Sequence, residues 1–201
     1  MSAPVILVGG TWGDVNHTWW KPGSSFCDAL AASGLTLADP YEPFQWSGDV
    51  DGTILDHFFG RPHRDWMAGG DALRWYAHLA IPPVNGVFQP VSVIAHSHAG
   101  QVALYAAASG LLIDTLITVA TPVRSDMQPV AAKARPRIRR WVHLYGGWRD
   151  YWQLLGARSL RRTMPVADLN VQEPGVDHSG LLNANLWTER GWFRWLRGET
   201  L

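Results

Sequence analysis

Residues 91–100 read VSVIAHSHAG. The first six are mostly apolar, which is typical of a strand buried on both faces of a parallel sheet. The residues from His98 to Ala108 are rich in alanine and precede Gly110, so they predict a helix that ends at a glycine. Because the strand passes directly into the helix, Ser97 lies in the turn between them. This stretch therefore predicts an α/β sheet with Ser97 at the carboxyl end of one strand.

The alternation of strand and helix continues along the rest of the chain. Apolar runs predict further strands at 4–8, 115–120, 138–145 and 166–171, and a weaker one within 36–46. Helical patterns lie at 24–33, 72–81, 151–162 and 181–196. In the first of these, Ser25 and Asp28 have the spacing of a capping box. We therefore expect a doubly wound parallel sheet of about six strands with right-handed crossovers, flanked by helices.

Length and composition indicate a single globular domain. The chain has 201 residues, so residues 1–201 are predicted to form one domain, with an irregular insertion at about 49–70. Hydrophobic residues make up 47% of the chain and charged residues 17%, which excludes a disordered protein. The single cysteine, Cys27, excludes an intramolecular disulfide, and the N-terminal residues lack the pattern of a signal peptide. We expect a cytoplasmic protein, without membrane insertion because no apolar run reaches about 18 residues.

Charge is distributed unevenly between the two halves of the chain. Residues 1–100 hold nine acids and four bases, whereas residues 101–201 hold eight acids and thirteen bases. The basic cluster at 133–140 lies beside a predicted strand and matches no nucleic-acid-binding motif. We interpret it as a solvated flank and expect no nucleic-acid partner.

Ser97 is the candidate nucleophile. It lies between two small residues, Ala95 and Ala99, in a strand–turn–helix segment, which is the context of a nucleophile elbow. Small residues are needed there because the sharp turn brings the backbones of strand and helix close together. The alternative is that Ser97 only caps the helix by accepting backbone N–H groups.

A general base and an acid follow Ser97 in the order that this kind of site requires. Asp150 comes after the predicted strand 138–145, and His178 lies in the loop after the next strand. His178 would take the proton from Ser97, and Asp150 would hold its tautomer and stabilise the imidazolium. The histidines on either side of Ser97 are excluded as bases, because adjacent side chains on a tight turn point away from each other.

Each of these assignments has an alternative. Asp150 could be a helix N-cap, and His178 a surface loop residue. Asp126 and Asp168 are the reserve acids, although Asp126 comes one crossover early and Asp168 lies within a predicted strand. The remaining late histidine, His143, also lies inside a strand.

Backbone N–H groups are candidates for an oxyanion hole. The N–H of His98, the residue after the nucleophile, is one donor, and the N–H of Thr11, after the first strand, is the other. The glycines before Thr11 could instead serve only a tight turn.

At these residues the chain resembles the α/β-hydrolase superfamily, in its small lipase and esterase branch without a large lid. The resemblance covers nearly the whole chain and is carried by VGGTW at 8–12, AHSHAG at 95–100, VATP at 119–122 and DHSGL at 177–181. It implies Ser97 as nucleophile, His178 as base and Asp150 as acid, with Thr11 and His98 as oxyanion donors. It also implies hydrolysis of an ester or thioester through an acyl-enzyme, without a cofactor.

Substrate and ligand sites are less sharply indicated. Trp12 and Trp148 adjoin the predicted site loops and would suit the walls of a site for a small or lipid-like ester, although most tryptophans are core residues. Residues 54–67 could cover the cleft in part. Incomplete metal patterns at His57, His63, Asp56 and Asp65, and at 49–52, do not predict a metal site. The alternatives to an esterase are a thioesterase or amidase with the same triad, or a non-catalytic binding module.

Overall fold

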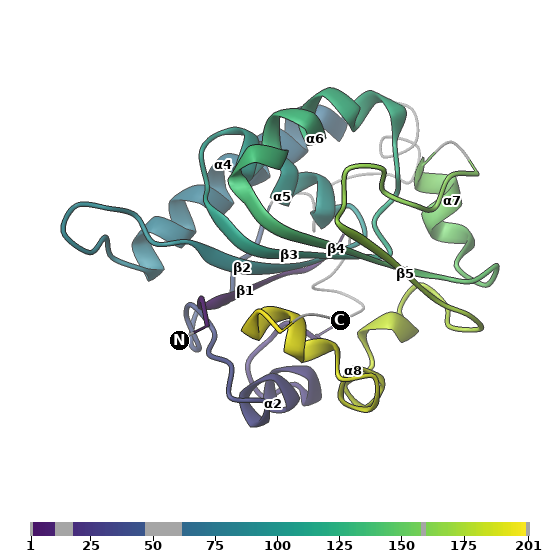
Figure 1. The fold of residues 1–201 in the computed structure, drawn as a ribbon, viewed down its shortest axis with the longest axis horizontal. Helices are drawn as coiled ribbons and strands as arrows, with labels where there is room; N and C mark the ends of the chain where they lie inside the picture. The colour runs from purple at the N-terminus through teal and green to yellow at the C-terminus, as the bar shows by residue number, and fades with distance from the viewer. Residues whose placement is uncertain (1, 11–17, 47–61, 158–159, 200–201) are drawn as a thin grey trace.

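A computed structural model describes residues 2–10, 18–46, 62–157 and 160–199 (Figure 1). Its centre is a parallel sheet whose strands lie side by side in chain order: β1 (Val5–Val8), β2 (Val91–His96), β3 (Ile113–Val119), β4 (Ile138–Gly146) and β5 (Leu169–Glu173). The strand residues of β1 and β2 are buried throughout, as the apolar runs predicted. The expected α/β class with a parallel sheet is confirmed.

The chain visits the two sides of β1 in turn, so the order in which it adds to the sheet reverses there. After β1 it passes through α2 (Ser25–Ala32) to Leu37, which forms a parallel bridge with Val5 on the outer edge of β1. It then returns through α4 (Pro62–Ala80) to β2 on the other side of β1. In doubly wound sheets a ligand site lies at the carboxyl ends of the strands that flank such a reversal. The carboxyl end of β2 is where Ser97 follows.

Helices cover both faces of the sheet. On one face lie α4, α5 (Ala99–Ala108) and α6 (Gln128–Ala134), and on the other lie α2, α8 (Ala184–Glu189) and a 3₁₀ helix at Trp192–Arg197 (Figure 1). Each layer encloses its own apolar core against the sheet. One further helix, α7 (Tyr151–Ala157), stands apart at the end of the sheet near β5 (Figure 1).

A glycine in α4 permits the close packing of α4 on α5. A Cβ atom at Gly70 would lie 2.6 Å from the Cβ of Tyr105 and 2.8 Å from the backbone nitrogen of Ala106. The predicted irregular insertion at 49–70 is therefore wrong for 62–70, which belong to α4. Gly69 and Gly70 pack against α5 and do not break the helix. Residues 49–61 of that prediction lie outside the described residues.

Other boundaries also differ from the prediction. The segment 36–46 contributes only the bridge at Leu37, so the described chain has five strands where about six were expected. The final helix is interrupted at Gly191, whose φ of +64° is left-handed. Ser24, not Ser25, caps α2, accepting the N–H of Cys27 at 3.2 Å. No helix within the described ranges is both long and apolar enough to cross a membrane.

Candidate active site

Ser97 occupies a strained turn between β2 and α5. Its φ is +55°, in the left-handed region that side chains other than glycine rarely adopt. Its backbone N–H donates to the carbonyl of Val119 at 2.8 Å, which ties the turn to the end of β3. A non-glycine residue is held in this conformation only where the surrounding structure enforces it, and such strain is typical of functional sites.

Two glycines make room for this turn. A Cβ atom at Gly100 would lie 2.2 Å from Oγ1 of Thr121, and one at Gly10 would lie 2.9 Å from the Cβ of Ser97. Gly10 is therefore packed directly against the candidate nucleophile. Ala95 and Ala99, to which the sequence argument assigned the tight packing, are fully buried. Gly100 and Gly10 are the positions where no side chain fits.

Asp150 and His178 are joined by a hydrogen bond. Nδ1 of His178 lies 2.8 Å from Oδ1 of Asp150, whose side chain is fully buried, whereas the imidazole is 14% exposed. The same Oδ1 accepts the backbone N–H of Gln153 at 3.1 Å, so Asp150 is also the N-cap of α7. The capping alternative is thus compatible with the pairing. Because Nδ1–H donates to the carboxylate, Nε2 of neutral His178 is left as a proton acceptor.

His96 connects the Ser97 turn to the His178 loop. Its Nε2 donates to the backbone carbonyl of His178 at 3.2 Å, and the two imidazole centroids are 4.7 Å apart. His96 is buried and directly precedes Ser97. Sequence reasoning excluded this histidine as a base and assigned it no other role. No pattern in a single sequence marks a contact between residues 82 positions apart.

The two reserve acids have other partners. Asp126 pairs with Arg124 and with Nε2 of His63, and the Arg124 hydrogen bonds hold the pKa of Asp126 at about 2. Asp168 pairs with Arg135 and accepts the backbone N–H of Trp141 at 2.8 Å. Of the three candidate acids, Asp150 is the one bonded to His178.

His143 is a second buried histidine near Asp150, and its hydrogen bonds are complete. The hydroxyl of Thr118 donates to its Nδ1 at 2.9 Å, and its Nε2 donates to the carbonyl of Arg162 at 2.9 Å. Burial lowers the pKa of His143 to about 4, against the opposing charge of Asp150. His143 is therefore held neutral inside the strand layer.

The remaining predicted site residues fall into two groups. Thr11 and Trp12 lie outside the described residues. His98 begins the turn into α5, and its ring stacks on Trp66 at 5.4 Å. Trp148 is 78% exposed, with the guanidinium of Arg149 lying 5.6 Å from its ring centroid.

The metal patterns gain no support from the part of the chain that is described. His63 bonds Asp126 and the hydroxyl of Tyr105, and Asp65 pairs with Arg64. No group of three or more His, Cys, Asp or Glu within the described residues could hold a metal ion. Asp56, His57 and 49–52 lie outside those residues.

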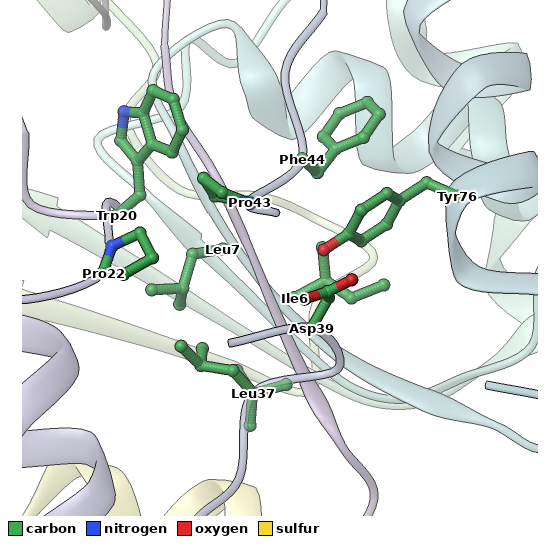
Figure 2. A pocket seen from close by; sticks show the side chains of 10 residues that line it. Ile6, Leu7, Trp20, Pro22, Leu37, Asp39, Pro43, Phe44 and Tyr76 are labelled. Atoms are coloured by element: carbon green, nitrogen blue, oxygen red, sulfur yellow. The ribbon is translucent and has the colours of Figure 1, made fainter. Parts of the chain in front are cut away.

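A small pocket lies away from these groups, at the outer edge of β1. It is lined by apolar side chains with Asp39 and Tyr76 at one end (Figure 2). The hydroxyl of Tyr76 donates to the carbonyl of Glu42 at 2.7 Å, and burial raises the pKa of this hydroxyl to about 12. The pocket reflects the packing of the segment after Leu37 on the sheet edge.

Solved structures similar to this chain cover almost its whole length. The esterase domain of a Rhodothermus marinus protein superposes with a TM-score of 0.60 at 13% identity, over 96% of this chain and 86% of that one. A predicted CIB-like hydrolase from Thermoplasma acidophilum gives 0.58 at 12% identity, over 98% and 87%. An α/β serine hydrolase without a lid from Xanthomonas campestris gives 0.53 at 16% identity, over 97% and 84%. No family model and no curated protein sequence matches the chain.

Proposed function

This chain has the fold of the α/β hydrolases, and we propose that it is a serine hydrolase that cleaves carboxylic esters through an acyl-enzyme. The observation that carries the proposal is the 2.8 Å bond between His178 and the buried Asp150, on a loop that His96 holds beside the Ser97 turn. A histidine oriented by a carboxylate, next to a serine on a strained turn, is the arrangement of a catalytic triad.

In the proposed reaction, Nε2 of His178 accepts the proton of Ser97 as Oγ attacks the ester carbonyl carbon. The carbonyl oxygen becomes an oxyanion, for which the backbone N–H of His98 and that of Thr11 are the proposed donors. The imidazolium then returns the proton to the departing alkoxide, and the alcohol leaves an acyl group on Ser97. Water repeats the sequence with His178 as base, which releases the acid and restores the serine.

Asp150 supports both halves of this cycle. Its negative charge faces the imidazolium that forms transiently. Because its side chain is buried, the attraction between these two charges is stronger than it would be at an exposed site. The N-cap bond from Gln153 fixes the carboxylate before substrate arrives. The site is therefore preorganised, which is the source of most electrostatic stabilisation in enzymes.

The substrate is proposed to be a small or lipid-like ester. Trp148 is an exposed aromatic surface two residues before Asp150, and we assign it, with Trp12, to the walls that receive the acyl or alcohol part. Ester, rather than amide, is the class to test first, because an alkoxide is a better leaving group than an amide anion; a thiolate leaves more readily still, so the panel includes a thioester.

The test combines covalent labelling with a substrate panel. The wild-type protein is treated with a fluorophosphonate probe and then assayed on p-nitrophenyl esters of increasing acyl length, an acyl thioester and an anilide. We expect the probe mass on the peptide that contains Ser97, and turnover highest on an ester. The control is Ser109→Ala, at the exposed end of α5, which should label as the wild type does. Equal labelling of the Ser97→Ala variant would overturn the proposal.

A further inference from the structure

Helix α7 presents its apolar residues to solvent. Its inward face carries Gln153, which is fully buried, and Ala157. Its outward face and the flanking loops carry large hydrophobic side chains that are between 44% and 89% exposed: Trp148, Tyr151, Trp152, Leu155 and Leu160, here called the α7 apolar face. A surface helix ordinarily has the opposite arrangement, with apolar residues toward the core. An exposed cluster of this kind indicates a surface that binds something apolar.

The same segment is strongly basic. Between Trp148 and Arg162 the sequence holds four arginines and one acid, and that acid, Asp150, is buried against His178. Arg149 extends over the ring of Trp148 and is exposed. Exposed tryptophan and tyrosine beside arginine is the composition of surfaces that lie at the boundary between water and lipid. The positive charge further favours an anionic boundary over a neutral one.

A second exposed apolar stripe provides an internal comparison. Met67, Trp75 and Leu79 lie along the outer side of α4, and the last two are 61% and 79% exposed. The helix that carries them holds two arginines and two aspartates, so it has no excess of positive charge. The α4 stripe thus matches the α7 apolar face in exposed aromatic and aliphatic residues but lacks the charge.

We propose that the α7 apolar face docks the protein on an anionic lipid surface. Trp152 and Leu155 enter the acyl boundary, while Arg149 contacts the headgroups. Because Asp150 is the N-cap of α7 and is bonded to His178, docking through α7 brings the candidate active site to that boundary (Figure 1). Binding itself needs no turnover, so the inference stands or falls separately from the proposed hydrolase activity.

The test measures co-sedimentation of the Ser97→Ala protein with vesicles, so that lipid is not consumed. Vesicles of equal parts phosphatidylcholine and phosphatidylglycerol are compared with vesicles of phosphatidylcholine alone. We expect binding to the anionic vesicles only, weakened when salt rises from about 0.1 M to about 1 M, since the Debye length falls from about 10 Å to about 3 Å. The added pair Trp152→Ser and Leu155→Ser should weaken binding about tenfold or more, and Arg149→Gln about fivefold.

The matched control is the pair Trp75→Ser and Leu79→Ser on α4, which should bind as the parent does. Circular dichroism and thermal melting of each variant establish that it is folded. Equal binding to neutral vesicles, equal loss in the α4 and α7 pairs, or no binding at all would overturn the proposal. So would light scattering that shows a dimer abolished by the α7 pair, because the occupant would then be a second copy of the chain.

Discussion

Replacing Asp150 with asparagine removes the charge that faces His178 and keeps the shape of the side chain. In the structure, Oδ1 of Asp150 accepts from both His178 and the backbone of Gln153, and an asparagine oxygen can accept the same two bonds. The new amide group then takes the position of Oδ2, which is buried and has no hydrogen-bond partner among the described residues. The variant should therefore fold, with a loss of stability of about 1–3 kcal/mol from the unsatisfied amide.

The effect on turnover follows from the geometry. With Nδ1 and Oδ1 2.8 Å apart, the charge centres of the pair are separated by about 4 Å, at which opposite charges attract by about 4 kcal/mol for an effective dielectric constant of 20. Loss of that attraction for the imidazolium lowers kcat by about 10³-fold. If the amide instead turns its NH₂ toward His178, the wrong tautomer is favoured and the loss approaches 10⁴-fold.

The measurement is kcat on the best ester from the panel, with Asp126→Asn and Asp168→Asn as matched controls. These two carboxylates are bonded to Arg124 and Arg135, so their variants should keep kcat within about threefold of wild type, as expected of changes that do not touch the reacting groups. An Asp150→Asn enzyme that retains a tenth of wild-type kcat, or a larger loss at Asp126, would refute the assignment of the acid.

Four further outcomes are expected. Ser97→Gly and Ser97→Ala should both abolish turnover, but Ser97→Gly should be more stable in urea unfolding by about 1 kcal/mol, because glycine tolerates the φ of +55°; equal stabilities would argue against strain at this turn. Gly100→Ala should lower the free energy of unfolding by about 1–3 kcal/mol through its clash with Thr121, and adding Thr121→Ala should recover part of the loss; strictly additive effects would contradict the contact. His96→Leu should lower kcat about tenfold, because it removes the hydrogen bond to the backbone carbonyl of His178. His96→Gln keeps a donor and should retain most of the wild-type kcat. Identical kcat values for the two variants would exclude a role for this hydrogen bond. Burial lowers the pKa of His143 to about 4, so as pH falls the unfolded state binds a proton before the folded state does. The contribution of neutral His143 to the free energy of unfolding is therefore complete above about pH 6.5, and about 3 kcal/mol of it is lost as pH falls toward 4. A His143→Gln variant with an unchanged pH slope in urea unfolding would disprove this.

The elements that the sequence predicts well are those whose signal is local. The apolar runs predict β1, β2 and β3, which are strands buried on both faces. Small residues at the junction of strand and helix predict the turn at Ser97. The order of Ser97, Asp150 and His178 was sufficient to select the carboxylate that bonds the histidine, because the carboxyl ends of parallel strands share one edge of the sheet.

The elements that were mispredicted depend on tertiary contacts. The start of α4 was missed because glycines at 69 and 70 disfavour a helix locally, yet Gly70 is where α4 approaches Tyr105 of α5. The helix α6 was not predicted, because it is short and begins beside a proline. The strand expected within 36–46 contains two prolines and pairs only at Leu37.

Two other contacts of the candidate site could not be predicted. A hydrogen bond from His96 to the backbone of His178 leaves no trace in either local pattern, since any residue could supply that carbonyl. The sequence predicts Gln153 only as a residue of a helix, although its N–H bonds the carboxylate of Asp150. Such contacts are specified by the packed sheet edge as a whole.

The ribosome makes Ser97 well before it makes Asp150 and His178, so the proposed triad is completed only late in synthesis. His178 follows His96 by 82 residues, and Asp150 lies between them, 28 residues before His178. At a synthesis rate of about 5–20 residues per second, roughly 4–16 seconds separate the end of β2 from His178, the proposed base. Throughout that interval a nascent chain carries Ser97 with no partner to take its proton. Newly made protein on the ribosome should therefore be inert toward esters and toward fluorophosphonates until β4 and β5 have joined the sheet.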